Sequence, residues 1–479
     1  MTDNPTVRTR MAPSPTGDVH IGTLRTGLYA YAFAKKNKGS FILRIEDTDQ
    51  KRLVEGSAQR ALDIFKKFGL IYDEGPDVGG DFGPYVQTQR LEIYQKYIKE
   101  LLDKGLAYYC FCTEERLIEI RELQKVAHKV PKYDRHCLNL TQAEIQDNLN
   151  KGVPYVIRMK IPQNETIIFN DMIRGEISFN SNDLDDQVLI KSNGIPTYHF
   201  AVVVDDHLMK ISHIVRAEEW ISSTPKHILL YRYFNWEVPK IAHLTVLLDP
   251  THSGKMSKRH GSVFAQQFLD DGYLPEALLN FLMLLGWNPG TDRELFTLKE
   301  FIEEFSVDHL HKKAAIFDRK KLDYFNGLYI RQKSDKELAK LLTPFIPKLD
   351  EKTILVLIPL IKERIVTLKQ AADFIKFIWS DVDYDQSLLV SEKVTADIAK
   401  DMLTKSKNLL KAETDWSVAS LQPKLMELIK SNNWKVGDFF MVFRIAITGS
   451  KQTPPIVDCL PILGVDNTLQ KLTLAISKL

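Results

Sequence analysis

A histidine and two glycines lie together in residues 13–23, a segment whose residue types suit phosphate binding. This segment, PSPTGDVHIGT, follows an apolar run and precedes apolar residues at helical spacing. A helix that starts after a strand presents amide N–H groups and a positive dipole end to a phosphate. Gly17 and Gly22 allow close backbone approach, and His20 can donate a hydrogen bond as charge develops on a triphosphate. The segment predicts a nucleotide site, with a capping histidine and turn glycines as the alternative.

Two lysines, Lys255 and Lys258, lie in the basic string KMSKR at residues 255–259. Negative charge accumulates on the leaving pyrophosphate when a nucleophile attacks the α-phosphate of ATP. Lysines on a loop could close over that group and neutralise the charge. A solvated basic loop is the alternative. Together, and in this order, the two segments resemble the two signature motifs of class I aminoacyl-tRNA synthetases, which implies an ATP site between them; a predicted strand leads into the second segment.

The elements that must position these segments alternate between strands and helices. Residues 7–12 and 41–45 are predicted strands around a helix at 20–36, a β-α-β unit that implies a parallel sheet. A second such group occupies residues 188–247, with VLI, AVVV, HIV and HLTVLL as strands and 224–234 as a helix.

A different pattern separates the two groups. Residues 91–187 open with helical segments and continue with alternating runs, which predicts an α+β insertion into the sheet domain. Strand signals fade after about residue 265, and amphipathic helical segments follow. The predicted fold class is α/β: a Rossmann-like parallel-sheet catalytic domain, split by the insertion and followed by an all-α C-terminal region.

Composition excludes some functions and leaves others open. The chain has 479 residues, 44% apolar and 26% charged, as in globular proteins of several domains. Its 64 Lys and Arg nearly balance 62 Asp and Glu, so a nucleic-acid partner needs a local basic surface. We see no signal-peptide pattern, no apolar stretch of membrane-spanning length and only four cysteines. We therefore expect a cytoplasmic protein without membrane contact.

A local basic surface is predicted between residues 310 and 340, where nine Lys and Arg stand against four Asp and Glu. Phe317, Tyr324, Phe325 and Tyr329 are interleaved with these charges. Basic groups can follow phosphates and aromatic rings can stack on bases, but we expect three of these four rings in the core. The segment is a candidate contact with RNA.

Further strings, in one consistent order, resemble those of glutamyl-tRNA synthetases, which are class I aminoacyl-tRNA synthetases. Besides PSPTGDVHIGT and KMSKR they are FILRIEDTD, YDEGP, PTYH, VDDH, RAEEW, FD…KL and NG…YIR, spread from residue 8 to about residue 449. Thr23 stands where the class motif has a second histidine, as is usual in this branch. The resemblance implies an enzyme of the bacterial type.

The resemblance also implies domain boundaries. A catalytic domain would comprise residues 1–90 and 188–248, with an acceptor-stem-binding domain inserted at 91–187. A stem-contact domain that carries the KMSKR loop would follow at 249–334, and all-α anticodon-binding domains at 335–479.

The resemblance further implies roles for single residues. Arg10 and Arg216 would hold the γ-carboxylate of glutamate, because a guanidinium binds a carboxylate bidentately. Arg10 could instead be solvated, and Arg216 could instead pair with Glu218 or Glu219. The other implied glutamate contacts are Ala12, Ser14, Tyr198 and, on the ammonium group, Glu46. The implied ATP contacts are Pro13, Gly17, His20, Gly22, Thr23, Glu219, Trp220, Leu247, Lys255, Met256, Ser257, Lys258 and Arg259, of which His20, Lys255 and Lys258 would be catalytic.

The implied reaction joins L-glutamate and ATP to glutamyl-adenylate and then esterifies the 3′ end of tRNA(Glu), with tRNA(Gln) as a second candidate. Mg²⁺ is expected to arrive with ATP, since no carboxylate cluster marks a dedicated magnesium site. We expect no editing site, because a buried arginine pair rejects uncharged analogues. Arg364 and Arg444 are candidate anticodon readers, and a monomer is expected. The alternatives are a nucleotidyltransferase without tRNA and an inactive RNA-binding paralogue.

Three cysteines in the insertion form a candidate zinc site. Cys110, Cys112 and Cys137 can supply three thiolates of a tetrahedral Zn²⁺ site. Relatives place the fourth ligand at the position of Asn139, which is a poor zinc ligand. The resemblance to a shortened paralogue favours Tyr133 as the substitute, and His136 is the other candidate. The alternative is reduced core thiols without metal.

Overall fold

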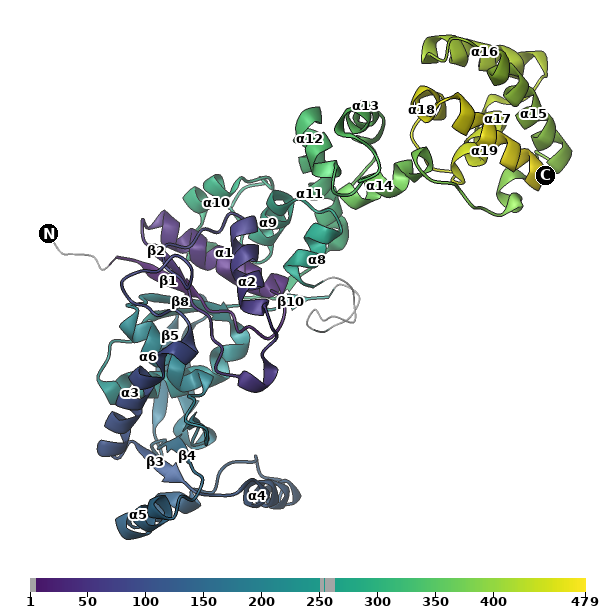
Figure 1. Ribbon diagram of the computed structural model, residues 1–479. Helices are drawn as coiled ribbons and strands as arrows, with labels where there is room; N and C mark the ends of the chain where they lie inside the picture. The colour runs from purple at the N-terminus through teal and green to yellow at the C-terminus, as the bar shows by residue number, and fades with distance from the viewer. Residues whose placement is uncertain (1–5, 250–253, 255–262) are drawn as a thin grey trace. The chain divides into compact units, whose positions relative to one another are not determined.

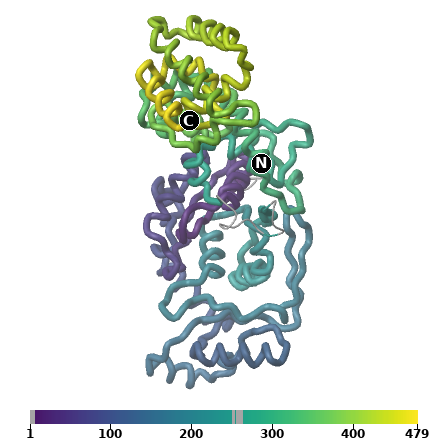
Figure 2. Tube along the Cα trace, turned by 90° about the vertical axis from the view of Figure 1, so that its right-hand side faces the viewer, coloured from purple at the N-terminus to yellow at the C-terminus, as the bar shows by residue number. Residues whose placement is uncertain are grey.

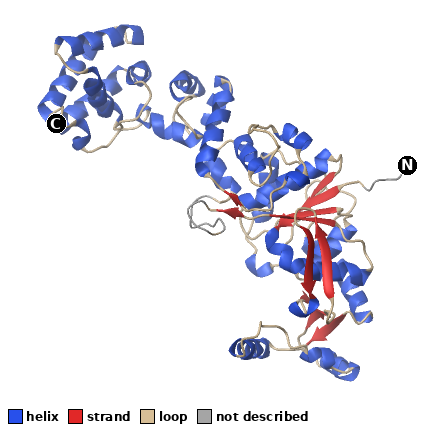
Figure 3. Cartoon of the chain, turned by 180° about the vertical axis from the view of Figure 1, so that it is seen from behind, coloured by secondary structure: helices blue, strands red, loops and turns tan. Residues whose placement is uncertain are grey.

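The computed structural model describes residues 6–249, 254 and 263–479 (Figure 1). It divides into two compact units: Met1–Phe268 with Leu278–Asp318, and Leu269–Ala277 with Arg319–Leu479. All described strands belong to the first unit, and the second is helical (Figure 3). Among the described residues, no helix has both the length and the apolar character that crossing a membrane requires.

The first unit begins with the predicted β-α-β motif: β1 (Arg8–Met11), α1 (Ile21–Lys36) and β2 (Ser40–Leu43). β1 and β2 are parallel. α1 buries Leu24 and Leu28 completely, as their helical spacing predicts.

A second β-α-β motif follows later in the chain: β8 (His213–Ala217), α7 (Thr224–Phe234) and β9 (Lys240–Leu244). β8 and β9 are parallel, and Pro225 lies in the first turn of α7 as expected. The string HLTVLL is divided, because its end forms a separate short strand, β10 (Leu247–Leu248).

The two motifs meet at β1 and β8, which are in contact (Figure 1; Figure 2 gives the Cα trace turned by 90°). Ser212, just before β8, donates its backbone N–H to the Arg8 carbonyl at 3.0 Å. The strand order is therefore β2-β1-β8-β9, and the chain leaves the β1–β8 boundary in opposite directions. Ligands of such parallel sheets bind beyond the carboxyl ends of the strands where the order reverses. The expected Rossmann-like parallel sheet is confirmed, and its reversal point is the place for a site.

A hairpin from the predicted insertion extends this sheet. β5 (Thr166–Asp171) and β6 (Gly175–Asn180) pair antiparallel, and β5 continues beyond β9 through the pair Asp171–Ile241. The larger sheet therefore includes residues from within 91–187, because their alternating pattern gives β5 one buried face.

One strand prediction in the second group was wrong, and one predicted strand belongs to a different sheet. The string AVVV lies in the helix α6 (Tyr198–Leu208) and is buried on every side, so its apolar run showed no helical period. VLI forms β7 (Val188–Ile190), which pairs antiparallel with β4 (Val156–Met159) in a small sheet outside the parallel one.

The first unit also contains elements outside this sheet. They are α2 (Ser57–Lys67), α3 (Leu91–Asp103), β3 (Ala107–Cys110), α4 (Glu114–Val126), α5 (Gln142–Asn150), α10 (Leu298–Glu304) and β11 (Ala315–Ile316). β3 lies in one sheet with β4 and β7, and β11 pairs with β10. The helices α8 (Ala265–Asp270) and α9 (Pro275–Leu284) each have residues in both units.

The second unit packs its helices around one apolar core, which confirms the expected all-α C-terminal region (Figure 3). Its helices are α11 (Arg319–Gln332), α12 (Asp335–Leu342), α13 (Glu351–Ile361), α14 (Leu368–Ile375), α15 (Ala396–Ala412), α16 (Val418–Ser431), α17 (Val436–Thr448), α18 (Ile456–Leu463) and α19 (Val465–Lys478).

The aromatic residues of the basic segment divide as expected. Phe317 and Phe325 are buried, and Tyr329 packs partly buried against the core of the second unit. Tyr324 is 57% exposed and is the one ring of the four available to a base.

Candidate active site

A cavity of about 880 Å³ lies at the carboxyl ends of β1 and β8. Its size is within the ~300–1,000 Å³ typical of small-ligand sites. It is lined by every described residue implied for the two small substrates: Arg10, Ala12, Pro13, Ser14, Gly17, His20, Gly22, Thr23, Glu46, Tyr198, Arg216, Glu219, Trp220 and Leu247. Lys255, Met256, Ser257, Lys258 and Arg259 lie outside the described residues.

His20 is fixed in orientation at the start of α1. Its Nδ1 accepts the backbone N–H of Gly22 at 3.0 Å, so the imidazole caps the helix through that nitrogen. In the neutral ring the proton is then on Nε2, which becomes the donor. A Cβ at Gly22 would lie 3.2 Å from Nδ1, and Gly17 has a φ of +145°, which favours glycine. The capping alternative and the binding role are therefore compatible, since each uses a different nitrogen.

The amide groups at the start of α1 are already occupied. Ile21 donates to the Val263 carbonyl at 2.9 Å, Gly22 donates to His20, and Thr23 donates to the His20 carbonyl at 2.9 Å. The expectation of free N–H groups for a phosphate is wrong at these three positions. An anion at the start of α1 would meet the His20 Nε2 proton and the helix dipole.

Arg10 is buried and held by a carboxylate. Its Nε and Nη2 bond Asp206 at 3.1 Å, and Arg44 bonds the same carboxylate at 2.8 Å. Burial alone would lower the pKa of Arg10, but Asp206 outweighs it and the pKa is raised. The alternative of a solvated Arg10 is wrong, since the residue is only 4% exposed.

Glu46 is buried beside Arg44, whose Nη2 donates to it at 3.0 Å. Burial raises the pKa of Glu46 to about 7, against the opposing effect of Arg44 and Arg10. A second positive charge in the cavity would therefore favour the ionised carboxylate.

Arg216 is equally buried but has no ionic partner among the described residues. Its Nε donates to His243 Nε2 at 3.0 Å, and its Nη2 donates to Thr224 Oγ1 at 2.8 Å. Its Nη1 lies 3.1 Å from His227 Nδ1. Burial lowers the pKa of Arg216, and Tyr198 opposes this shift only in part.

The expected alternative pairing of Arg216 with Glu218 is wrong. Glu218 forms an ion pair with Arg174 and accepts the Val246 backbone N–H at 2.8 Å. No ion pair joins Arg216 and Glu219, both of which are described. β8 ends at Ala217, and both glutamates lie in the 3-10 turn that follows, Glu218–Ser223.

The buried ion pairs of this region leave Arg216 out. Arg10, Arg44 and Arg90 form ion pairs with the carboxylates Glu46, Asp205 and Asp206. Arg216 forms none among the described residues, and the buried carboxylate of its own network, Asp171, bonds to His243 instead. A buried guanidinium without an ionic partner is costly unless an anion completes it. The cavity is therefore suited to an anionic ligand at Arg216.

Several residues that hold this site were not identified from the sequence. Arg44, Asp206, His227 and His243 each touch a predicted ligand residue. A charged pair such as Asp205-Asp206 next to an apolar run is a usable signal, because buried charges need partners. His227 in α7 and His243 in β9 are single histidines, and no pattern around them in the sequence predicts a role in the site.

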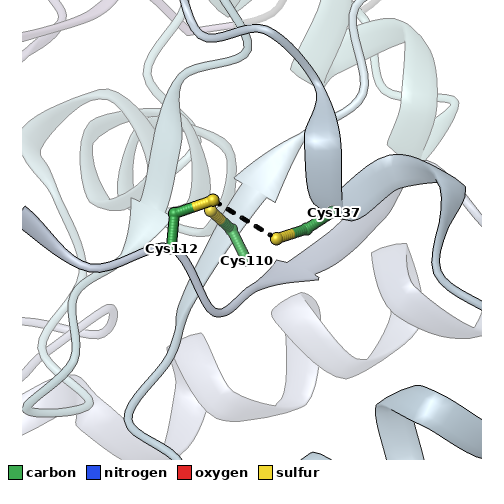
Figure 4. Close-up of side chains that lie close together, drawn as sticks. All are labelled: Cys110, Cys112 and Cys137. Carbon is green, nitrogen blue, oxygen red and sulfur yellow. Dashed lines mark hydrogen bonds between the residues drawn. The ribbon is translucent and has the colours of Figure 1, made fainter. Parts of the chain in front are cut away.

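The three predicted zinc-binding thiols converge in the small sheet (Figure 4). Their sulfur atoms all lie within 4.8 Å of one another, and Cys112 Sγ is 3.5 Å from Cys137 Sγ. Sulfurs bound to one tetrahedral Zn²⁺ at ~2.3 Å are about 3.8 Å apart. The Tyr133 hydroxyl lies 3.4 Å from Cys112 Sγ, whereas His136 does not join the cluster. The residues present fit a tetrahedral zinc ion with Tyr133 as the fourth ligand.

Two family models match this chain over most of its length. Residues 6–324 match the family model described as tRNA synthetases class I (E and Q), catalytic domain. Residues 337–476 match a second model, the anticodon binding domain. The fold and the cavity at its reversal point are thus those of a class I tRNA synthetase.

Within this class, the chain is similar over nearly its whole length to glutamate–tRNA ligases. A glutamate–tRNA ligase of Clostridioides difficile (strain 630) is 43% identical over 97% of this chain and 98% of that protein. Another, of Borrelia duttonii (strain Ly), is 44% identical over 96% and 93%. A crystal structure of a glutamate tRNA ligase from Elizabethkingia meningosepticum in complex with its amino acid has a TM-score of 0.84 and 34% identity, and each chain is covered to 99%. The chain belongs to the glutamate–tRNA ligase family.

Proposed function

We propose that this chain activates L-glutamate with ATP and transfers it to tRNA(Glu), as a glutamate–tRNA ligase. The observation that carries the proposal is Arg216, a buried guanidinium without an ionic partner in a cavity that His20 also lines. The family match supports the same conclusion over nearly the whole chain.

Four side chains that line the cavity have roles in this reaction. Arg216, with Arg10 beside it, holds the γ-carboxylate, and Glu46 holds the ammonium group, so the α-carboxylate is left to attack ATP. No general base is needed, because that carboxylate is already an anion. His20 donates its Nε2 proton to the phosphates as charge develops. Mg²⁺ that arrives with ATP would supply positive charge against the triphosphate.

The decisive assay charges purified tRNA(Glu) and tRNA(Gln) separately with labelled glutamate. We expect charging of tRNA(Glu), and the yield with tRNA(Gln) decides whether the second acceptor is used. ATP turnover with glutamate that yields no aminoacyl-tRNA with either would favour the nucleotidyltransferase alternative. The helical second unit and its match to an anticodon binding domain favour the ligase.

Glutamate binding should depend on pH through Glu46. Its pKa of about 7 is that of the chain without substrate, and the substrate ammonium favours the carboxylate, so binding below pH 7 must release a proton. We expect the Kd for glutamate to rise about tenfold from pH 8 to pH 6. Calorimetry in two buffers of different ionisation enthalpy measures both the Kd and the proton release. Glu46→Gln is the control: its Kd should be weaker but independent of pH, and an equally flat profile for the unsubstituted chain would contradict the assignment.

The second unit contains a cavity of about 680 Å³ that both candidate anticodon readers line. Arg444 has a buried Nε without a hydrogen-bond partner among the described residues, and Arg364 lies on the same wall. We propose that an unstacked anticodon base enters here. Arg444→Ala should lower kcat/KM for tRNA about tenfold and leave the KM for glutamate unchanged. Lys411→Ala, which removes an exposed charge outside the cavity, should change neither, and equal effects of both variants would contradict the placement.

The domain roles implied by the resemblance are part of this proposal. The catalytic and inserted domains lie within the first unit, and the anticodon model begins at residue 337, close to the predicted boundary at 335. The stem-contact domain at 249–334 has no counterpart as a compact unit, since the units divide at Asp318 and Arg319. We propose a monomer that acts in the cytoplasm, where its tRNA substrate and a reducing environment for four free thiols are found.

We also propose that Cys110, Cys112, Tyr133 and Cys137 hold one structural Zn²⁺. Protein purified without chelator should contain about one zinc per chain, and Cys137→Ser should lose the metal and unfold at lower temperature. Tyr133→Phe should weaken zinc retention, whereas His136→Ala should not. A content below ~0.2 zinc per chain would favour unligated core thiols.

A further inference from the structure

The side chains that hold Arg216 form a connected set of neutral acceptors. Thr224 Oγ1, His243 Nε2 and His227 Nδ1 each lie within 3.1 Å of a guanidinium nitrogen. A carboxylate would bind the same N–H donors more strongly than a neutral acceptor does. Arg10 is held in this stronger way, by Asp206. Arg10 and Arg216 are therefore held by opposite means, one by a carboxylate and the other by neutral acceptors.

The hydrogen bonds fix the tautomer of each histidine. Arg216 can only donate, so His243 Nε2 must accept, and its Nδ1 proton goes to Asp171 Oδ2 at 2.7 Å. Asp171 is held by this proton and by the backbone N–H groups of His243, Ile173 and Arg174. A second proton on the imidazole would have to face the guanidinium.

The same logic extends through His227 to the cavity wall. His227 Nδ1 accepts from Arg216, so its Nε2 proton is directed to His199 Nδ1 at 3.1 Å. His199 then carries its own proton on Nε2 and lines the cavity. Burial lowers the pKa of His227 well below its usual value, and Arg216 adds to the effect. Burial also lowers the pKa of His199, to about 4.

We propose that His227 and His243 are specificity-determining positioning residues, which orient Arg216 through neutral acceptors and so leave its full charge to select a substrate carboxylate over a carboxamide. The inference rests on the proposed function and deepens it. A carboxylate in either place would orient the guanidinium just as well but would neutralise it. Orientation and charge are thus separable, and a matched pair of variants separates them.

The test compares His227→Gln with His227→Glu. The two side chains have nearly the same size, and each can place an oxygen on Arg216 Nη1, but only one carries a charge. We expect the KM for glutamate of the Glu variant to exceed that of the Gln variant about 100-fold, while the KM for ATP differs less than threefold. Inhibition by glutamine should weaken far less, so the preference for glutamate over glutamine falls with the KM.

A packing role for His227 would give the two variants the same KM for glutamate, and that result would overturn the inference. Absence of charging by the unsubstituted chain would instead overturn the proposed function. If the Glu variant does not fold, Thr224→Asn and Thr224→Asp repeat the comparison at another acceptor of Arg216, at a helix start that tolerates both residues. Equal KM values in this pair would also overturn the inference.

Discussion

Replacing Arg216 with glutamine is expected to lower kcat/KM for glutamate about 10³-fold, the largest loss that any single substitution in the cavity should cause. Glutamine keeps hydrogen-bonding groups but has no charge, so the substrate γ-carboxylate is buried without an ionic partner. The loss should appear mainly in the KM for glutamate, because Arg216 contacts a part of the substrate remote from the reacting atoms. Steady-state charging of tRNA(Glu) measures it.

Arg216→Lys is the matched control, since it keeps the charge. A lysine has no fork, so it cannot bond three protein acceptors and a carboxylate together. We expect an intermediate loss, about 30-fold, and a smaller change in the preference for glutamate over glutamine. If the Gln variant retained a kcat/KM within tenfold of the parent value, Arg216 would not bind the γ-carboxylate.

His20→Asn is expected to lower the rate of adenylate formation between 10²- and 10³-fold without loss of stability. Asparagine caps helices well, so its oxygen can accept the Gly22 N–H that His20 Nδ1 accepts now. It is too short to replace the Nε2 proton. The variant therefore separates the two nitrogens of the imidazole, one structural and one directed at the phosphates.

The comparison for this residue is His20→Gln, whose amide reaches the Nε2 position. Single-turnover measurement of adenylate formation should show a smaller loss, about tenfold, for this variant. The thermal midpoint of the Asn variant should equal that of the parent, since the cap of α1 is retained. Adenylate formation by the Asn variant at the parent rate would show that His20 is only a helix cap.

The sequence sufficed for those parts of the fold with a clear period. β1, α1 and β2 follow from their apolar spacing, and the position of His20 at the start of α1 follows from the change of pattern. AVVV failed because a helix that is apolar all round and a buried strand have the same short apolar run. The hairpin β5–β6 showed the right period, but a strand's period does not say which sheet it joins.

In the candidate site, some residues could be predicted from the sequence and their contacts could not. Arg10 and Arg216 could be proposed as ligand residues because they lie in motifs that resemble those of a known family. The structure places both residues on the wall of one cavity. The sequence could not predict that Arg10 pairs with a carboxylate and Arg216 with histidines. These contacts depend on Asp206 in α6 and His227 in α7, which only the folded chain brings close to the two arginines. Contacts across 196 and 11 residues leave no local signature in the sequence.

We propose that glutamate attacks ATP in the cavity at the carboxyl ends of β1 and β8, which forms glutamyl-adenylate and releases pyrophosphate. ATP–pyrophosphate exchange in the presence of tRNA(Glu), with each of the twenty amino acids in turn, measures this step. We expect exchange with glutamate and none above background with glutamine or aspartate, and its loss in Arg216→Gln. Equal exchange with glutamine, or exchange unchanged by Arg216→Gln, would contradict the account.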